Sequence, residues 1–144
     1  MIQKNELTVF LVDDDALFLK SLEIDFLEQA LCKVSTFKTG EECIVQLTED
    51  PDLIILDYHL DGIDPHAMNG LQTLDKIKHI KPEIPVVILS SQDKISVAVD
   101  CLHHKAHDYV VKSETAFFRL QMIVDSLRKY QHLEKKLSWY IDRM

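Results

Sequence analysis

The chain has 144 residues, the size of one ordinary domain with a core large enough to fold alone, which leaves no room for a second large domain. Apolar residues make up 47% of it and charged residues 28%, which excludes a disordered chain. The formal net charge of -8 argues against direct binding of nucleic acid, which depends on clustered Lys and Arg side chains.

The sequence also bears on the compartment of the protein. No apolar run approaches the ~20 residues of a membrane-spanning helix, and the N-terminus has no signal-peptide cleavage pattern. We therefore expect a cytoplasmic protein without membrane insertion. The cysteines Cys32, Cys43 and Cys101 lie far apart with no C-x-x-C motif, so we expect buried free thiols and neither a disulfide framework nor a zinc site.

Short apolar runs alternate with longer amphipathic stretches along the chain, which is typical of βαβ units around a parallel sheet. The predicted strands are 7–12, 32–37, 53–56, 86–89 and 109–111. The third and fourth are almost continuously apolar, as expected of central strands covered on both faces. The predicted helices span about 16–30, 40–49, 70–80 and 93–104. The pattern predicts an α/β fold with a doubly wound, five-stranded parallel sheet.

Local signals agree with these elements. Thr39 and Glu42 have capping-box spacing before the second helix, and Pro51 and Pro82 follow the second and third helices, where they would stop continuation. The last segment, 114–142, is predicted to be one extended C-terminal helix, unusually long for so small a domain.

Chemically active groups stand at the ends of four predicted strands: Asp13, Asp14 and Asp15 after the first, Asp57 after the third, Ser90 and Ser91 after the fourth, and Lys112 after the fifth. In doubly wound sheets this edge binds ligands. Neighbouring carboxylates repel one another unless a cation lies between them, and oxygen ligands suit Mg²⁺. Such a metal could hold a phosphoryl donor against one Asp, with a lysine and a hydroxyl neutralising the phosphoryl oxygens, to give an aspartyl phosphate.

Four segments carry a family resemblance: FLVDDDALFLKSLE, LIILDYHL, IPVVILSS and HDYVVKS. Over residues 7 to about 128 the chain resembles the CheY-like response-regulator receiver domains of two-component signalling. The resemblance implies a flavodoxin-like (βα)5 fold, with a receiver domain at 1–128 and a helical extension at 129–144. It implies a phosphoacceptor that is not an enzyme beyond its own phosphorylation and dephosphorylation. The implied partners are a histidine kinase or phosphotransfer protein and a downstream effector protein, with a homodimer as a possible output.

Carried over position by position, the resemblance implies a metal and phosphoryl site. Asp57 would be the phosphoacceptor and a metal ligand. Asp14 would bind Mg²⁺ directly and Asp13 mostly through water, with the backbone carbonyl of His59 as a further ligand. Asp15 is instead expected to cap the first helix.

The resemblance also implies a switch. Ser90 matches the switch hydroxyl, and Tyr109 matches the aromatic residue that moves inward on activation. Lys112 matches the lysine that pairs with the phosphoryl group. Ser91 matches the neighbouring small residue, where bulk would block the phosphoryl site.

Several features depart from the family pattern. The loop after Asp57, YHLDGIDPHAMNG, is about five residues longer than usual, with Asp61 where proline is common, and could be a flexible lip or a partner contact. Lys105 replaces a glycine that usually ends the fourth helix, and Ser113 replaces the proline that often follows the lysine in cis peptide linkage. The histidines His103, His104 and His107 are expected to be solvated helix-end residues, not a metal site.

Two other functions remain open. The VDDDAL segment offers the Asp-x-Asp spacing of haloacid-dehalogenase-type phosphatases, with Asp13 as nucleophile and Asp15 as acid/base, although the usual Gly and Thr are missing. A receiver-like scaffold that never takes phosphate is the other alternative. The complete set of acids, hydroxyl and lysine argues against it.

The last helix carries a coiled-coil spacing through Ala116, Leu120, Ile123, Leu127, Tyr130, Leu137 and Ile141, interrupted by Glu134. Phe117, Leu120 and Val124 are expected to cover the sheet. We expect residues 129–144 to form a homodimer or to dock a partner, and we favour the dimer. The alternatives are that this end folds back on its own domain or is the stub of a linker.

Overall fold

The computed structural model describes residues 6–144 and confirms the predicted fold class. One sheet contains β1 (Thr8–Val12), β2 (Lys33–Phe37), β3 (Leu53–Asp57), β4 (Val86–Ser90) and β5 (Asp108–Val111). The strand order is β2-β1-β3-β4-β5, and every neighbouring pair is parallel. Because the chain winds outward in opposite directions from β1 and β3, the switch point of the sheet lies between these two strands.

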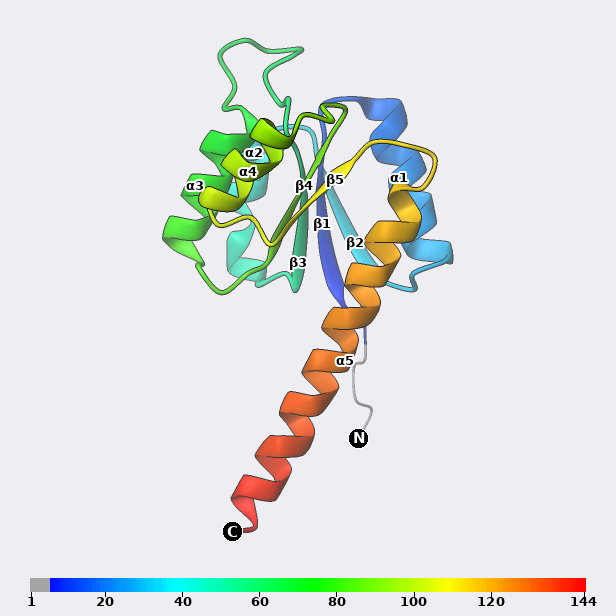
Figure 1. Cartoon of the computed structure of the whole chain (residues 1–144), viewed down its shortest axis with the longest axis vertical. Helices are drawn as coiled ribbons and strands as arrows, with labels where there is room; N and C mark the ends of the chain where they lie inside the picture. Colours follow the sequence, from blue (N-terminus) through cyan, green and yellow to red (C-terminus); the bar gives the residue numbers. More distant parts are fainter. Residues whose placement is uncertain (1–5) are drawn as a thin grey trace.

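Helices cover both faces of the sheet. Helices α1 (Ala16–Glu28) and α5 (Ala116–Asp142) lie on one face, and α2 (Gly40–Val45), α3 (Gly70–Ile80) and α4 (Ile95–His103) lie on the other (Figure 1). Alternate residues of β3 therefore enter two separate cores: Leu53 and Ile55 pack toward α1 and α5, whereas Ile54 and Leu56 pack toward α2, α3 and α4. This explains why the run is apolar throughout.

The structure corrects several predicted boundaries. The second helix does not run through 40–49: α2 ends at Val45, and a separate 3-10 turn, η1 (Leu47–Glu49), follows it. The fourth helix begins at Ile95 rather than at 93. Strands β3 and β4 each extend one residue further than predicted, so Asp57 and Ser90 are the last residues of these strands, with backbones held in the sheet.

Helix caps differ from the prediction in detail. The Thr39 hydroxyl accepts the N–H of Glu42 as expected, but the Glu42 carboxylate accepts the N–H of Lys38, so the capping box is only half formed. A complete capping box occurs instead at the start of α3, between Asn69 and Gln72. Its polar residues stabilise the end of the long loop that precedes α3.

Lys105 and Ser113, which stand where the family usually has glycine and proline, are both accommodated by the backbone after α4. Lys105 adopts the left-handed conformation, with φ of 72°, in the turn after α4, a position usually given to glycine. All peptide bonds in 6–144 are trans, so Ser113 follows a trans peptide. As expected, Cys32, Cys43 and Cys101 are buried free thiols.

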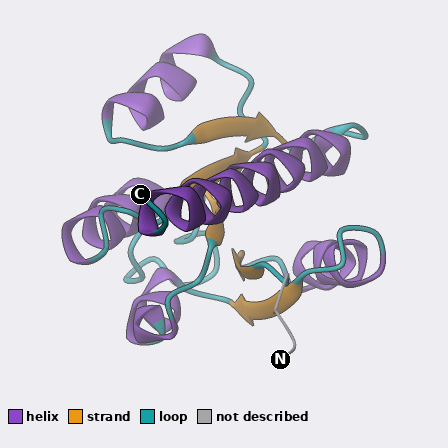
Figure 2. Cartoon of the chain, turned by 90° about the horizontal axis from the view of Figure 1, so that it is seen from below, coloured by secondary structure: helices purple, strands orange, loops and turns teal. Residues whose placement is uncertain are grey.

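Helix α5 leaves the domain partway along its length. The Arg128 guanidinium donates hydrogen bonds to the carbonyls of Ala30 (2.6 Å) and Leu31 (3.0 Å), and the Gln131 amide donates to Asp52 (3.0 Å). All residues from 132 to 144 are exposed. This end of α5 projects below the sheet and, seen from below, lies in front of the strands (Figures 1 and 2). No helix within residues 6–144 has the length and apolar character needed to cross a membrane.

Candidate functional site

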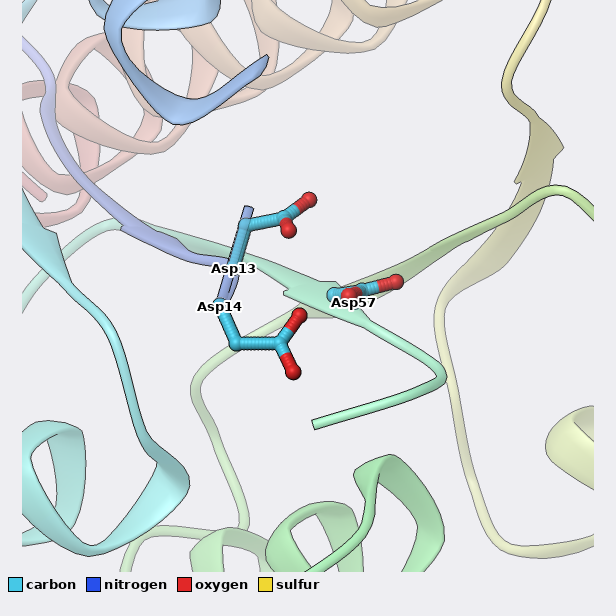
Figure 3. Close-up of side chains that lie close together, drawn as sticks. All are labelled: Asp13, Asp14 and Asp57. Atoms are coloured by element: carbon cyan, nitrogen blue, oxygen red, sulfur yellow. The ribbon is translucent and has the colours of Figure 1, made fainter. Parts of the chain in front are cut away.

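Three carboxylates meet where β1 and β3 end. Asp13 and Asp14 follow β1, and Asp57 closes β3; one oxygen from each lies within 4.8 Å of the others (Figure 3). Asp13 and Asp57 are buried, and Asp14 is half-buried. Among residues 6–144 this is the one group of three or more acidic, His or Cys side chains close enough to share a metal ion. An all-oxygen donor set suits Mg²⁺.

Lys112, which follows β5, reaches two of these acids. Its Nζ lies 2.9 Å from Oδ2 of Asp13 and 3.3 Å from Oδ1 of Asp57, and 4.4 Å from the centre of the Phe18 ring. Burial lowers the pKa of Lys112, but the hydrogen bond to Asp13 and the charge of Asp57 outweigh burial and raise the pKa overall. The lysine is therefore a permanent positive charge at the site.

One lysine does not neutralise this cluster. Burial, followed by repulsion from Asp13, raises the pKa of Asp57 to about 7, although Lys112 and the N–H of His59 act in the opposite direction. A carboxyl group with this pKa is only partly ionised near neutral pH. A second cation beside Asp57 would favour its ionised form, and the three-oxygen arrangement gives Mg²⁺ a place to supply that charge.

Asp15 belongs to α1 and not to the acidic cluster. Its carboxylate caps the helix by accepting the N–H groups of Leu17 (3.1 Å) and Phe18 (3.2 Å), as expected. Asp13 in turn accepts the N–H of Asp15 at 2.9 Å. Because its carboxylate is engaged in the cap, Asp15 is poorly placed as the acid/base of a phosphatase whose nucleophile is Asp13.

The two serines at the end of β4 have different environments. Ser90 is fully buried, and its Oγ accepts the N–H of Gln92 at 3.0 Å. Ser91 is exposed and lines the same pocket as Asp57. The phenol of Tyr109, in β5, is directed inward and donates to the carbonyl of Gln92 at 2.5 Å. Ser90 therefore binds the N–H, and Tyr109 the carbonyl, of the same residue in the β4–α4 loop, Gln92.

The long loop, residues 58–69, rises above the edge of the sheet that carries the acids (Figure 1). The N–H of Ile63 donates to Oδ2 of Asp14 at 3.3 Å, so the loop contacts the acidic cluster directly. Ile63 and Leu17 line the pocket and are 76% and 85% exposed, which places apolar side chains at its mouth. The sequence suggested a flexible lip or a partner contact, but not this hydrogen bond to Asp14.

A close backbone contact fixes the far end of this loop. The N–H of Gly70 donates to the carbonyl of Tyr58 at 3.0 Å, and a Cβ at Gly70 would lie 2.6 Å from the carbonyl oxygen of Asp57. Glycine is therefore required here, because any side chain would push α3 away from the end of β3.

The histidine that caps the C-terminal end of α4 lies beside two carboxylates. His104 Nδ1 lies 2.7 Å from Asp75 of α3, and His104 Nε2 lies 3.7 Å from Asp100. The exposed His104–Asp75 pair joins the C-terminal end of α4 to the middle of α3. Its hydrogen bond to Asp75, more than the nearby charges, raises the pKa of His104.

Comparisons with known proteins agree with this geometry. The family model for the response regulator receiver domain matches residues 9–124. A protein-glutamate methylesterase/protein-glutamine glutaminase from Treponema pallidum is 35% identical over 95% of the chain, and the probable C4-dicarboxylate response regulator DctR of Bacillus subtilis is 29% identical over 94%. The chain spans 35% of the first relative and 57% of the second.

Solved structures give the same result. The signal receiver domain of a putative Luxo repressor protein from Vibrio parahaemolyticus superimposes with a TM-score of 0.76 at 25% identity, covering 92% of this chain and 97% of that one. The receiver domain of NtrX from Brucella abortus gives a TM-score of 0.71 at 27% identity, covering 84% and 98%.

Proposed function

Because the chain belongs to the response regulator receiver domain family, we propose that it is a Mg²⁺-dependent phosphoacceptor that takes a phosphoryl group on Asp57 and transmits the signal by a conformational switch. The observation that carries the proposal is the meeting of Asp13, Asp14 and Asp57 around one space, with Lys112 beside two of them. In the same proposal, residues 1–128 are the receiver domain, and 129–144 are an extension of its last helix.

The residues divide the chemistry between them. Asp14, Asp57 and the carbonyl of His59 would hold Mg²⁺ directly and Asp13 mostly through water; the bound ion supplies positive charge to the phosphoryl oxygens. An Asp57 oxygen attacks phosphorus as the bond from phosphorus to the donor breaks, which gives an aspartyl phosphate. Lys112 pairs with the new phosphoryl oxygens. Ser91, exposed in the pocket, leaves room for them.

The output would pass through the β4–α4 loop. A phosphoryl group on Asp57 adds charge and acceptor oxygens, which draw the hydroxyl of Ser90 away from the N–H of Gln92. Tyr109 holds the carbonyl of the same residue, so the loop and the tyrosine would move together. Ser90 and Tyr109 are therefore the proposed switch residues.

The proposed partners are proteins of two-component signalling. A histidine kinase or phosphotransfer protein would supply the phosphoryl group in the cytoplasm, and a downstream effector protein would recognise the switched surface. The exposed Leu17 and Ile63 at the mouth of the pocket suit contact with the phosphodonor protein. Within the proposal the domain is a signalling module, with no catalysis beyond its own phosphorylation and dephosphorylation.

Beryllofluoride, which mimics an aspartyl phosphate, tests the proposal against a phosphatase centred on Asp13. With Mg²⁺, it should bind the wild-type protein and shift the NMR signals of Gln92 and Tyr109. It should bind Asp15→Ala equally well, but not Asp57→Asn. Binding that survives in Asp57→Asn and is lost in Asp15→Ala would instead favour the phosphatase.

A further inference from the structure

The end of α5 carries an apolar stripe that is largely exposed, although Tyr130 at its start lines a pocket together with Asp50, Lys81 and Ile84 of the domain. Four residues of α5, and Met144 just beyond its end, share this stripe and are each more than half exposed: Tyr130, Leu133, Leu137, Tyr140 and Met144. The last tethers of the helix to the domain are Arg128 and Gln131. Water-exposed apolar surface on a regular helix favours association.

From Leu133 onward the stripe points away from the chain's own domain. Val124 is fully buried against the sheet and marks the inward side of α5. At ~100° per residue, Leu133 lies ~180° around the helix from Val124, Leu137 ~140° and Tyr140 ~160°. As long as α5 is straight, this stripe faces away from the domain. The domain of the same chain therefore does not cover it.

The inward positions of α5 serve a different contact. Leu120 is fully buried and Ala116 nearly so, as expected for residues that cover the sheet. The seam predicted from the sequence, which runs from Ala116 to Ile141 with an interruption at Glu134, is thus occupied in its first half by the domain itself. The seam of the projecting end is a separate one, in which Leu133 and Tyr140 replace Glu134 and Ile141.

This separate seam has heptad spacing. Tyr130, Leu137 and Met144 occupy a positions, and Leu133 and Tyr140 occupy d positions, in alternating steps of three and four residues. Lys129 then falls at g and Glu134 at e. In a parallel pair of such helices a g residue faces the e residue of the next heptad on the partner, so Lys129 of one copy would face Glu134 of the other.

We propose that residues 129–144 form a parallel two-stranded coiled coil with the same segment of a second copy of this chain. Charge selects the orientation, because an antiparallel pairing would bring the g-position cations Lys129, Lys136 and Arg143 of the two helices together. The parallel pairing matches Lys129 with Glu134 and brings Lys136 beside the apolar Ile141. Since the seam lies opposite the inward side of α5, each domain stays on the outer side of its own helix.

The segment is short, so the dimer should be weak and dependent on concentration. Only roughly two heptads are available, which is marginal for an isolated coiled coil. The inference does not rest on phosphorylation of Asp57, because no residue of the seam touches the acidic cluster.

Sedimentation equilibrium of the full chain, from about 1 μM to about 1 mM, tests the proposal. The wild-type mass should rise from monomer to dimer over this range. Leu137→Lys should remain monomeric throughout. Trp139→Lys is the matched control, because Trp139 is 51% exposed and Leu137 60%, but Trp139 lies off the seam; it should dimerise as wild type does.

A charge exchange tests the orientation. Lys129→Glu and Glu134→Lys should each weaken the dimer about threefold or more, and the double variant should restore it. A wild-type mass that stays monomeric would overturn the proposal, as would equal effects of Leu137→Lys and Trp139→Lys. Lack of rescue in the double variant would overturn the parallel alignment. Circular dichroism of each variant checks that α5 is retained.

Discussion

Lys112 Nζ lies 3.3 Å from Oδ1 of Asp57, so the residue that follows the last strand favours the ionised form of the residue that ends the central one, against burial and the repulsion from Asp13. Lys112 also binds Asp13 at 2.9 Å, and both acids are buried. The metal-free site is therefore a balance between one lysine and three carboxylates, and it responds to any change in either.

Removing the lysine should destabilise the metal-free protein. Lys112→Met leaves Asp13 and Asp57 without their partner, and we expect a loss of about 2 kcal/mol in EDTA, partly recovered with Mg²⁺. Thermal unfolding measures both values. Lys20→Met is the control, because Lys20 forms an exposed ion pair with Glu23 and should change stability little. Equal losses of stability in the two variants would show that Lys112 does not stabilise the buried carboxylates of Asp13 and Asp57.

Mg²⁺ affinity should depend on Asp14. Asp14→Ala removes one of three carboxylates from a hard, strongly hydrated cation, and the dissociation constant should increase well beyond tenfold. Asp15→Ala should leave Mg²⁺ affinity nearly unchanged while costing about 1 kcal/mol of stability through loss of the α1 cap. Calorimetry is the suitable measurement. The sole tryptophan, Trp139, lies on the projecting part of α5, away from the acidic cluster, so its fluorescence would not report metal binding. An unchanged constant in Asp14→Ala would contradict the metal site.

The link between α3 and α4 should depend on pH. The hydrogen bond to Asp75 raises the pKa of His104 above its usual value of 6.5, so its contribution to stability is present in full below 6.5 and is lost as pH rises through the folded-state pKa. Asp75→Asn should return the His104 pKa toward 6.5. An NMR titration of the imidazole, at low and high salt, checks this; a His104 pKa unaffected by Asp75→Asn would show that the pair does not form in solution.

The switch should be separable from phosphorylation. Ser90→Ala leaves the acids and Lys112 in place, so it should still accept phosphate, but the Gln92 amide loses the oxygen to which it donates. Beryllofluoride should then cause much smaller NMR shifts at Gln92 and Tyr109 than in wild type. Ser91→Ala is the matched control and should keep the full shifts. Shifts as large as those of the wild type in Ser90→Ala would show that Ser90 does not couple Asp57 to Gln92 and Tyr109.

Much of the fold could be predicted because the apolar pattern of a strand indicates whether one or both of its faces are buried. Residues 53–56 and 86–89 are apolar throughout, and both strands proved to be buried on two faces. The acids could be predicted to meet because parallel strands end at one edge. The exact ends of the elements could not be predicted. The break between α2 and η1 is a local change of backbone conformation that the apolar pattern of residues 40–49 does not show.

Some contacts between distant segments could not be predicted from the sequence. The hydrogen bond from Ile63 to Asp14 and the His104–Asp75 pair depend on where a long loop, α3 and the end of α4 lie in space, which local patterns do not encode. The seam of α5 shows the same limit. The burial of Leu120 and Val124 was expected, but the sequence did not show that the projecting end carries its exposed seam on the opposite side of the helix, through Leu133 and Tyr140.

The most direct test of the phosphoacceptor proposal is the intact mass after incubation with acetyl phosphate and Mg²⁺. The wild-type protein should gain ~80 Da, the mass of one phosphoryl group, and should not gain it in EDTA. Asp57→Asn, which keeps the shape of the side chain but removes the nucleophile, should gain nothing under either condition. Full labelling of Asp57→Asn, or no labelling of the wild type with Mg²⁺ present, would contradict the assignment of Asp57 as the phosphoacceptor.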